Sequence, residues 1–558
     1  MKKYLMFSVA FLFVSLLFTS PSILRPVSAK RQRPQFASDR LLVKYRTQVE
    51  DREIERDITE RMLPAGSSQI QSLHTNALGK FYVVKLSNGL SVEEAASILR
   101  QSPNVEYAEP DYYLYPTDTT PDDPLFTTEW GMFNSGPPTG KSGADINAPK
   151  AWDISTGSDD VVAAVIDTGV QLTHPDLAAN AWVNPNEIAG NGSDDDGNGF
   201  VDDINGWNFF DNNNQVFDAV VDQGQGGHGT HVAGTLGAVG NNATGVAGVA
   251  WHVKLMVLKF IGQQPDGSYM GQTSDAIKAI NYAITERKRG INLRVINASW
   301  AGRKNAQGLH DAINAAGQAG IVFVCAAGNG DIGFDNDDPD FALYPAAWSD
   351  IPTLISVSAL DDQDNLAFFS FFGHQTVGVG APGVGIMSTL PINSYGQISG
   401  TSMASPHVAG IAVLLAAHEP SLTPGQIVQR IINTAKPVLT LASKTISSGR
   451  ADAFNALTNQ TADPGSPQIA AVTTNKKWIT VDGIGFRNGS AVVEAGGVSV
   501  GTATYDSSFA LANGTITELS VKLGKALVRS MFPPGVPVQI DVFNPTTGER
   551  SAPFTYTK

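Results

Sequence analysis

The chain has 558 residues, of which 42% are hydrophobic, so it exceeds one ordinary domain and can bury a large core. Its net charge of −15 is unevenly distributed: residues 1–115 contain 15 Lys and Arg against 12 Asp and Glu, and the remainder contains 23 against 41. The acidic remainder makes nucleic acid a poor partner. Cys325 is the only cysteine, which excludes a framework of internal disulfides.

Residues 1–29 have the three-part layout of a cleavable secretory signal. Lys2 and Lys3 precede an apolar run, and a small-residue cleavage site ends at Ala29. The apolar run is too short to serve comfortably as a membrane anchor. We therefore expect a secreted, extracellular monomer with no membrane contact once the signal is removed. Because disulfides are excluded, bound metal is an attractive source of stability.

Residues 30–116 are expected to form a small α+β module. Alternating apolar patterns predict strands at 40–45, 81–86 and 104–110, and apolar residues at helical spacing predict a helix at 91–101. The stretch that follows is rich in proline and acidic residues, which is typical of a linker.

Residues 117–460 alternate apolar β-rich runs with helical patterns, which predicts an α/β domain with a parallel sheet. The expected strands are residues 161–166, 254–258, 294–298, 321–326 and 354–357. A second linker, residues 461–467, carries prolines and a glycine. Residues 468–558 contain short alternating runs between glycine and asparagine turns, which predict a small β-sandwich.

Three short segments carry the residues of an acyl-transfer site. Asp167 ends an apolar strand, and Gly169 allows a sharp turn at the carboxyl edge of the sheet, where open α/β sheets bind ligands. His228 opens a helix of small residues, and Ser402 opens another. A serine hydroxyl needs an imidazole to accept its proton, and the imidazole needs a carboxylate to orient it. We therefore assign Ser402 as nucleophile, His228 as base and Asp167 as orienting group.

A fourth segment supplies a donor for the negative charge that develops on the substrate oxygen. Asn329 follows an apolar strand and would deliver its side-chain amide to the same edge of the sheet. The position of Ser402 at a helix start adds backbone N–H groups and the positive end of the helix dipole. His231 and His407 are interpreted as packing histidines.

These motifs resemble those of the subtilisin-like serine proteases, in particular the thermitase-like members, over roughly residues 124–457. The order Asp, His, Ser, the segments HGTHVAG and GTSMASPH, and the AAGN turn carry the resemblance. It implies a seven-stranded parallel sheet, endopeptidase activity on polypeptides, and a substrate that binds as an added strand. The implied substrate-binding residues are Ser299, Trp300, Ala301, Gly302, Ala327 and Gly328. Trp300 and Ala301 stand where relatives usually have Leu and Gly, which reshapes the cleft.

Two alternatives come from other functional classes. A catalytically inactive homologue could act as a calcium-dependent binding protein, although retention of all four site residues argues against it. An esterase or other acyl hydrolase would use the same triad without the extended peptide cleft.

The acidic segment from residue 194 to 203 matches a calcium loop of EF-hand type. The ligands on this interpretation are Asp194, Asp196, Asn198, the Phe200 carbonyl and Asp202. Asn205 stands where a calcium loop has glutamate, and a solvated acidic turn is the alternative. Repulsion among so many close carboxylates favours a bound Ca²⁺. The family resemblance implies a second calcium site, formed by Asp123, Asp176, Val239, Asn242, Thr244 and Val246.

Both flanking regions also resemble known modules. The region 30–116 looks like an inhibitor-type propeptide, which implies that it covers the cleft, assists folding and is removed by the enzyme itself. An ordinary accessory domain is the alternative. The region 468–558 resembles the IPT/TIG immunoglobulin-like domains, for which adhesion, substrate binding and a spacer role all stay open.

Overall fold

The structure is a computed structural model, and the signal expected at residues 1–29 lies outside its described part. That part comprises residues 36–62, 68–73, 79–86, 91–112, 118–137, 140–224, 227–501, 503–504 and 506–558. The chain divides into two compact units, Met1–Thr117 and Asp118–Lys558. No helix in the described residues is long and apolar enough to cross a bilayer.

The first unit contains one four-stranded antiparallel sheet in the order β2-β3-β1-β4. Its elements are β1 (Phe36–Tyr45), α1 (Asp51–Met62), β2 (Ser68–Leu73), β3 (Lys80–Leu86), α2 (Val92–Leu99) and β4 (Val105–Tyr112). The Ser91 hydroxyl accepts a hydrogen bond from the Glu94 N–H and completes a capping box that fixes the start of α2. Helix α1 was not expected from the sequence, because only Ile54 and Ile58 are buried apolar side chains among residues 51–61, for which burial is described.

The second unit is built on a nine-stranded sheet in the order β16-β17-β13-β12-β11-β10-β5-β7-β6. Its strands are β5 (Gly157–Asp167), β6 (Gly206–Asn208), β7 (His252–Lys259), β10 (Leu293–Ala298), β11 (Val322–Ala326), β12 (Leu354–Leu360), β13 (Val379–Pro382), β16 (Lys436–Pro437) and β17 (Gly449–Arg450). All neighbours are parallel except β16 and β17. The five expected strands are all present. The two-residue strands β16 and β17 extend the implied seven-stranded core at one edge.

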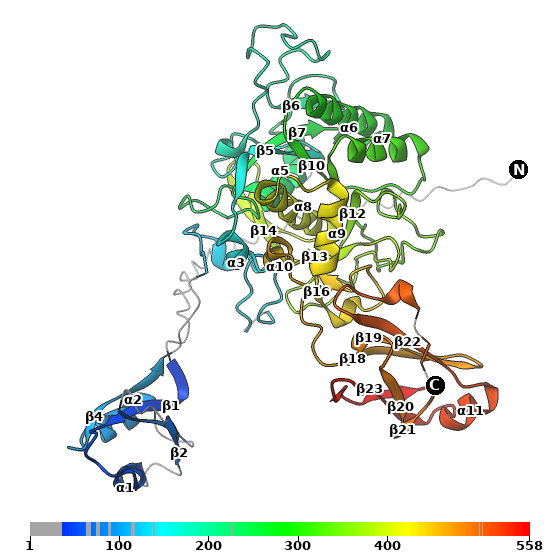
Figure 1. Ribbon diagram of the computed structural model, residues 1–558. Helices are drawn as coiled ribbons and strands as arrows, with labels where there is room; N and C mark the ends of the chain where they lie inside the picture. Colours follow the sequence, from blue (N-terminus) through cyan, green and yellow to red (C-terminus); the bar gives the residue numbers. More distant parts are fainter. Residues whose placement is uncertain are drawn as a thin grey trace, which may run out of the picture. The chain divides into compact units, whose positions relative to one another are not determined.

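Helices cover both faces of this sheet, as Figure 1 shows around β5, β7 and β10. The helices are α3 (Ala148–Trp152), α4 (Val221–Gly224), α5 (His228–Gly237), α6 (Thr273–Lys288), α7 (Gln307–Gln318), α8 (Thr401–His418), α9 (Pro424–Thr434) and α10 (Ala453–Thr458). Alternate residues of β5 face opposite layers: Val165 packs with the layer that contains α5 and α8, and Ile166 with the layer that contains α6 and α7. Two hairpins, β8 (Ile261–Gln263) with β9 (Tyr269–Gly271) and β14 (Ile386–Leu390) with β15 (Ser394–Ile398), lie outside the main sheet.

The C-terminal region forms two antiparallel sheets around a core of its own. One sheet contains β18 (Gln468–Thr474), β19 (Trp478–Arg487) and β22 (Thr515–Lys522), and the other contains β20 (Val492–Ala495), β21 (Val498–Ser499), β23 (Pro537–Asn544), β24 (Glu549–Arg550) and β25 (Phe554–Thr557). Helix α11 (Lys525–Met531) was not expected. This arrangement agrees with the expected β-sandwich fold.

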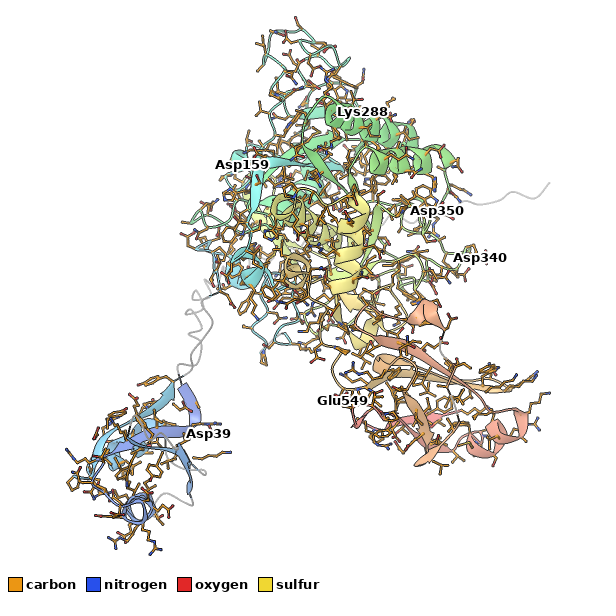
Figure 2. All side chains as sticks on the ribbon, in the orientation of Figure 1. Asp39, Asp159, Lys288, Asp340, Asp350 and Glu549 are labelled. Atoms are coloured by element: carbon orange, nitrogen blue, oxygen red, sulfur yellow. The ribbon has the colours of Figure 1, made fainter. Side chains whose placement is uncertain are left out.

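Charged side chains such as Asp159, Lys288 and Asp350 lie on the outside of the second unit, as Figure 2 shows.

Candidate active site

Three residues of the predicted site leave the sheet at one edge. Asp167 is the last residue of β5, Ser299 follows β10, and Asn329 comes three residues after β11. Strands β5, β10 and β11 are parallel neighbours, with Asn297 opposite Val165 and Ala298 opposite Cys325. Because parallel strands end at a common edge, residues far apart in the chain lie together there.

Asp167 and His228 are in direct contact. His228 is the first residue of α5, and its Nδ1 lies 2.7 Å from Asp167 Oδ1. The Thr168 N–H donates to the same oxygen at 2.7 Å, which fixes the carboxylate. The side chain of Asp167 is 1% exposed and that of His228 is 24% exposed, so the imidazole alone reaches solvent. The pair therefore presents an oriented imidazole at the sheet edge.

The charge environment favours the protonated form of His228. Burial opposes a positive imidazole, but the charge of Asp167 and the hydrogen bond to it outweigh burial and raise the pKa of His228 above its ordinary value. Burial lowers the pKa of both His231 and His407 to about 4. His231 Nε2 lies 2.8 Å from the Ile386 carbonyl oxygen, and His407 Nδ1 lies 2.8 Å from that of Met403. Both rings thus bind backbone oxygens within the core.

Ser402 lies near the start of α8 and is tied to the residue that follows β10. Its hydroxyl donates to the Ser299 carbonyl at 3.1 Å, and the Ser299 hydroxyl donates to the Ser402 carbonyl at 2.8 Å. Asn297 donates to the Ser299 hydroxyl at 2.9 Å. These bonds fix the helix start against the segment that is expected to bind substrate.

The side-chain amide of Asn329 is held in one orientation by Thr401. Both the N–H and the hydroxyl of Thr401 donate to Asn329 Oδ1, at 2.9 and 3.0 Å, so the amide oxygen is engaged and Nδ2 is turned the other way. A methyl group placed on Gly400 would lie 3.5 Å from Asn329 Nδ2 and 3.6 Å from the Ser402 nitrogen. Two donors therefore border one point beside Gly400. The orienting role of Thr401 was not anticipated from the sequence.

A cleft of about 490 Å³ opens beside His228. Its lining includes the expected substrate-binding residues Ser299, Trp300, Ala301 and Gly302, together with Phe260, Leu309 and Tyr344. The Trp300 indole N–H donates to the Ile166 carbonyl at 2.8 Å, and its ring packs edge-on against Phe260 at 5.0 Å between centroids. The indole is thus anchored to the sheet and forms a wall of the cleft.

Binding of substrate as an added strand would use backbone N–H and carbonyl groups, and those of Ala327 and Gly328 are hydrogen-bonded within the protein. The Ala327 N–H donates to Val357 and its carbonyl accepts from Asn336. The Gly328 N–H donates to Thr401, and its carbonyl accepts from Phe371. All four backbone groups have partners within the fold, and both residues are buried.

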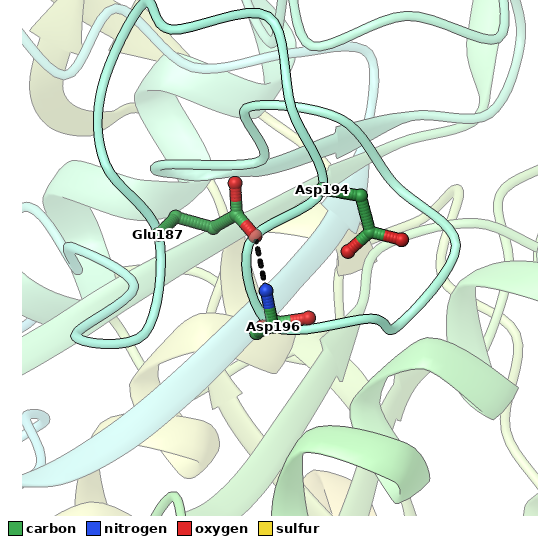
Figure 3. Close-up of side chains that lie close together, drawn as sticks. All are labelled: Glu187, Asp194 and Asp196. Atoms are coloured by element: carbon green, nitrogen blue, oxygen red, sulfur yellow. Dashed lines mark hydrogen bonds between the residues drawn. The ribbon is translucent and has the colours of Figure 1, made fainter.

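The acidic loop brings together three carboxylates, from Glu187, Asp194 and Asp196, as Figure 3 shows. Each offers one oxygen, and these oxygens lie within 4.8 Å of one another. Glu187 Oε1 accepts a hydrogen bond from the Asp196 N–H at 3.0 Å, while its buried Oε2 has no partner in the described residues. This donor set fits a hard cation such as Ca²⁺. Glu187 lies before the segment that was compared with a calcium loop and was therefore missed.

The other expected ligands of this loop have different surroundings. Asp202 accepts hydrogen bonds from the Asn191 and Gly192 N–H groups at 3.2 and 2.9 Å. Asn198 donates to Asp203 at 2.8 Å, and the Phe200 ring packs against Trp207. The backbone of Asp202 has a φ of 53°, so the chain turns there.

The residues of the second expected calcium site do lie together. Asp176 Oδ1 accepts from Asn242 at 2.9 Å, and its Oδ2 accepts from the Val246 N–H at 2.9 Å. The Thr244 N–H donates to Asn242 Oδ1 at 2.7 Å, and the Val239 N–H donates to the Asp176 carbonyl at 2.8 Å.

Asp123 joins this group through the same loop. Its Oδ2 accepts from the Asn241 N–H at 2.6 Å, and its buried Oδ1 has no partner in the part of the chain that the structure describes. Burial raises the pKa of Asp123 to about 6. An unpaired buried carboxylate oxygen beside Asp176 and Asn242 fits a Ca²⁺ ligand.

Comparison with known proteins identifies the family. A family model described as the subtilase family matches residues 158–471, and one described as the fervidolysin N-terminal prodomain matches residues 25–111. A thermophilic serine proteinase from Bacillus sp. (strain AK1) is 33% identical over 439 residues, which is 79% of this chain and 92% of that protein. Thermitase from Thermoactinomyces vulgaris is 36% identical over 319 residues, 57% of this chain and 92% of its own. An extracellular protease from Xanthomonas campestris pv. campestris is 32% identical over 457 residues, 77% of this chain and 73% of its own. The chain therefore belongs to the subtilase family and is a subtilisin-like serine endopeptidase with an N-terminal prodomain.

Proposed function

We propose that this endopeptidase is secreted as an inactive precursor, is stabilised by Ca²⁺, and cleaves polypeptides with Asp167, His228 and Ser402 as its catalytic triad. The observation that carries the proposal is the 2.7 Å contact between His228 Nδ1 and Asp167 Oδ1 at the sheet edge where Ser402 and Asn329 also lie.

The first half of the reaction forms an acyl-enzyme. The Ser402 hydroxyl first turns from the Ser299 carbonyl so that it donates to His228. Its oxygen then attacks the peptide carbonyl carbon as His228 Nε2 takes the proton, and Asp167 stabilises the resulting imidazolium. Asn329 Nδ2 and the Ser402 N–H stabilise the negative carbonyl oxygen. His228 returns the proton to the leaving amine, and the C–N bond breaks.

The second half releases the product. A water molecule replaces the leaving amine, gives its proton to His228, and attacks the acyl carbon. The ester bond breaks as the Ser402 oxygen regains a proton. Each group thus returns to its initial state.

The prodomain supports the proposed inhibition and self-processing. Its match to a fervidolysin-type prodomain covers residues 25–111, and the stretch after it precedes the catalytic unit that starts at Asp118. We infer that the prodomain is the intramolecular inhibitor of the cleft and that the enzyme cuts it off.

Secretion is supported by the signal-like sequence at residues 1–29 and by the similarity to a protein named extracellular protease. Stabilisation by Ca²⁺ is supported by the carboxylates of the two candidate sites. Bound Ca²⁺ would supply positive charge that offsets carboxylate repulsion, held by Glu187, Asp194 and Asp196 at one site. At the other, the ligands would be Asp123, Asp176, Asn242 and the carbonyl oxygens of Val239, Thr244 and Val246.

The decisive experiment replaces the nucleophile. Ser402→Ala should abolish hydrolysis of casein and leave unprocessed precursor after secretion, because no oxygen remains to attack. Mature-size protein from this variant alone would contradict self-processing. Casein and a small ester, tested side by side with wild-type enzyme, separate a protease from an esterase.

A further inference from the structure

A buried ion pair lies within the main domain, outside the set of residues that bind or attack the substrate. Lys259, the last residue of β7, places its Nζ 2.5 Å from Oδ1 of Asp222 in α4. The two side chains are 2% and 1% exposed. Removal of two charges from water is costly, and apolar residues of similar volume often give equal stability. Stability alone therefore does not account for this pair.

The pair contacts the segment that carries Asp167. Lys259 lies opposite Asp167 in the parallel register of β5 and β7, and the next residue, Phe260, donates its N–H to the Asp167 carbonyl at 3.0 Å. A methyl group on Gly169 would lie 2.6 Å from Asp222 Oδ2, so the carboxylate packs directly against the backbone that follows Asp167. Gly169 has a φ of 127°, which L side chains rarely adopt.

Asp222 also contacts the segment that carries His228. The Gly227 N–H donates to the Asp222 carbonyl at 3.1 Å, and Gly227 is the residue before His228 at the start of α5. The Asp218 N–H donates to Asp222 Oδ2 at 2.7 Å, which holds the carboxylate in place. One aspartate thus touches both segments of the candidate catalytic pair, with its charge balanced by Lys259.

We propose that the Lys259–Asp222 ion pair is a positioning element that sets the separation and orientation of Asp167 and His228. The inference rests on the proposed triad. Neither residue reacts: Asp222 joins the backbone after Asp167 to the backbone before His228, and Lys259 holds Asp222 against the end of β5. The contact that depends on this positioning is the one between the His228 imidazole and the Asp167 carboxylate. An error of about 1 Å in such a contact can cost about 100-fold in rate.

The test removes both charges while it keeps volume and a hydrogen-bond acceptor. In Lys259→Met/Asp222→Asn we expect kcat on a peptide substrate to fall about 100-fold while KM stays constant. In the same double variant carrying Ser402→Ala, the low-field proton resonance of His228 Nδ1–H should shift or broaden. The single variant Lys259→Arg, which keeps the charge, should recover part of the kcat that the double variant loses. It should fold even if the double variant does not.

A second buried pair provides the matched control. Arg450 and Asp364 form an ion pair with side chains 1% and 9% exposed, and Arg450 belongs to β17, which lies beside the edge strand β16. Arg450→Met/Asp364→Asn should lower the melting temperature and leave kcat and the His228 resonance unchanged. Wild-type kcat and an unshifted resonance in the Lys259/Asp222 double variant would overturn the inference. The His228 resonance tests the inference even if the wild-type enzyme proves inactive. Inactivity of the wild-type enzyme would count against the proposed function instead.

Discussion

The contact between Asp167 and His228 determines the charge environment of the proposed base. The carboxylate is buried and its charge faces the imidazole, so the pKa of His228 lies above the ordinary value for histidine. A base with a raised pKa is protonated, and therefore unable to accept the Ser402 proton, over a wider acidic range.

The pH dependence of activity should report this shift. Below its pKa the imidazole of His228 is charged, so kcat/KM should fall as the pH drops through a midpoint above about 6.5, the ordinary histidine value. Because the protonated form is the inactive one, a raised pKa moves the acidic limb toward higher pH. Hydrolysis of a neutral peptide across the pH range measures the midpoint, and a midpoint below 6.5 would contradict the assignment.

Asp167→Asn should separate orientation from charge. The amide keeps the shape of the side chain but favours the wrong tautomer of His228, and the corresponding change in a trypsin-type triad lowers kcat about 10⁴-fold. The acidic limb should also move to lower pH, because the charge that raises the pKa is gone. Steady-state kinetics at several pH values provide both readouts, and unchanged kcat would count against the proposed triad.

Asn329→Ala tests the donor beside Gly400. Loss of one oxyanion donor in subtilisin costs about 10²–10³-fold in kcat, and we expect a loss of that order with little change in KM. Thr401→Val is the informative companion, since it removes only one of the two bonds that hold Asn329 Oδ1 and should cost less. Equal losses in both variants would mean that Thr401 does more than orient the amide.

Among the elements, the loop between η3 (Ala178–Asn180) and β6 gathers carboxylates whose negative charge is only partly balanced. Glu187, Asp194 and Asp196 lie together, and the ion pair between Arg289 and Asp196 supplies a single positive charge. Burial raises the pKa of Glu187, and nearby carboxylates add to the effect. Such a loop gains stability when a divalent cation binds.

Chelation should therefore lower the melting temperature. Ca²⁺ that binds only the folded state at 100 times its dissociation constant adds about 2.7 kcal/mol. We expect EDTA to remove this stabilisation in the Ser402→Ala protein, which cannot digest itself, and Glu187→Gln to weaken Ca²⁺ binding in calorimetry. Asp159→Asn, at an exposed carboxylate outside both sites, is the control. Identical melting curves with and without EDTA would remove the calcium proposal.

For the chain as a whole, the C-terminal sheets have their own core, and the proposed catalytic residues all lie before them. Side chains link the two regions: His374 stacks on Phe509 at 4.3 Å, and the Ser443 hydroxyl donates to the Thr517 carbonyl at 3.3 Å. The IPT/TIG resemblance of this region stays a prediction.

Deletion of residues 468–558 should leave hydrolysis of a short peptide intact, because no group of the proposed mechanism lies there. The melting temperature should fall modestly as the surface around His374 and Ser443 becomes exposed. Kinetics and circular dichroism of the truncated enzyme check both expectations. A folded but inactive truncation would show that the tail belongs to the catalytic unit.

How much of the fold could be predicted from the sequence varies with the residue pattern of each helix or strand. Strands such as β10 and β12 are buried at every position, so they appear as continuous apolar runs and were expected near their observed bounds. Strand β13, with the sequence VGAP, carries Gly and Pro that argue against a strand, yet neighbouring strands hold it in the sheet. Helix α1 was missed because its charged surface leaves one apolar residue per turn.

The sequence by itself determined the order and identity of the proposed catalytic groups, because each lies in a short segment whose residue types the chemistry requires. Only the tertiary structure decided that Glu187 joins Asp194 and Asp196, that Thr401 orients Asn329, and that Asp222 touches both sides of the Asp167–His228 pair. These contacts join residues distant in the chain, and they depend on how turns such as the one at Asp202 direct the backbone. Local periodicity reports the conformation of a segment, whereas contacts across segments follow from packing of the whole core.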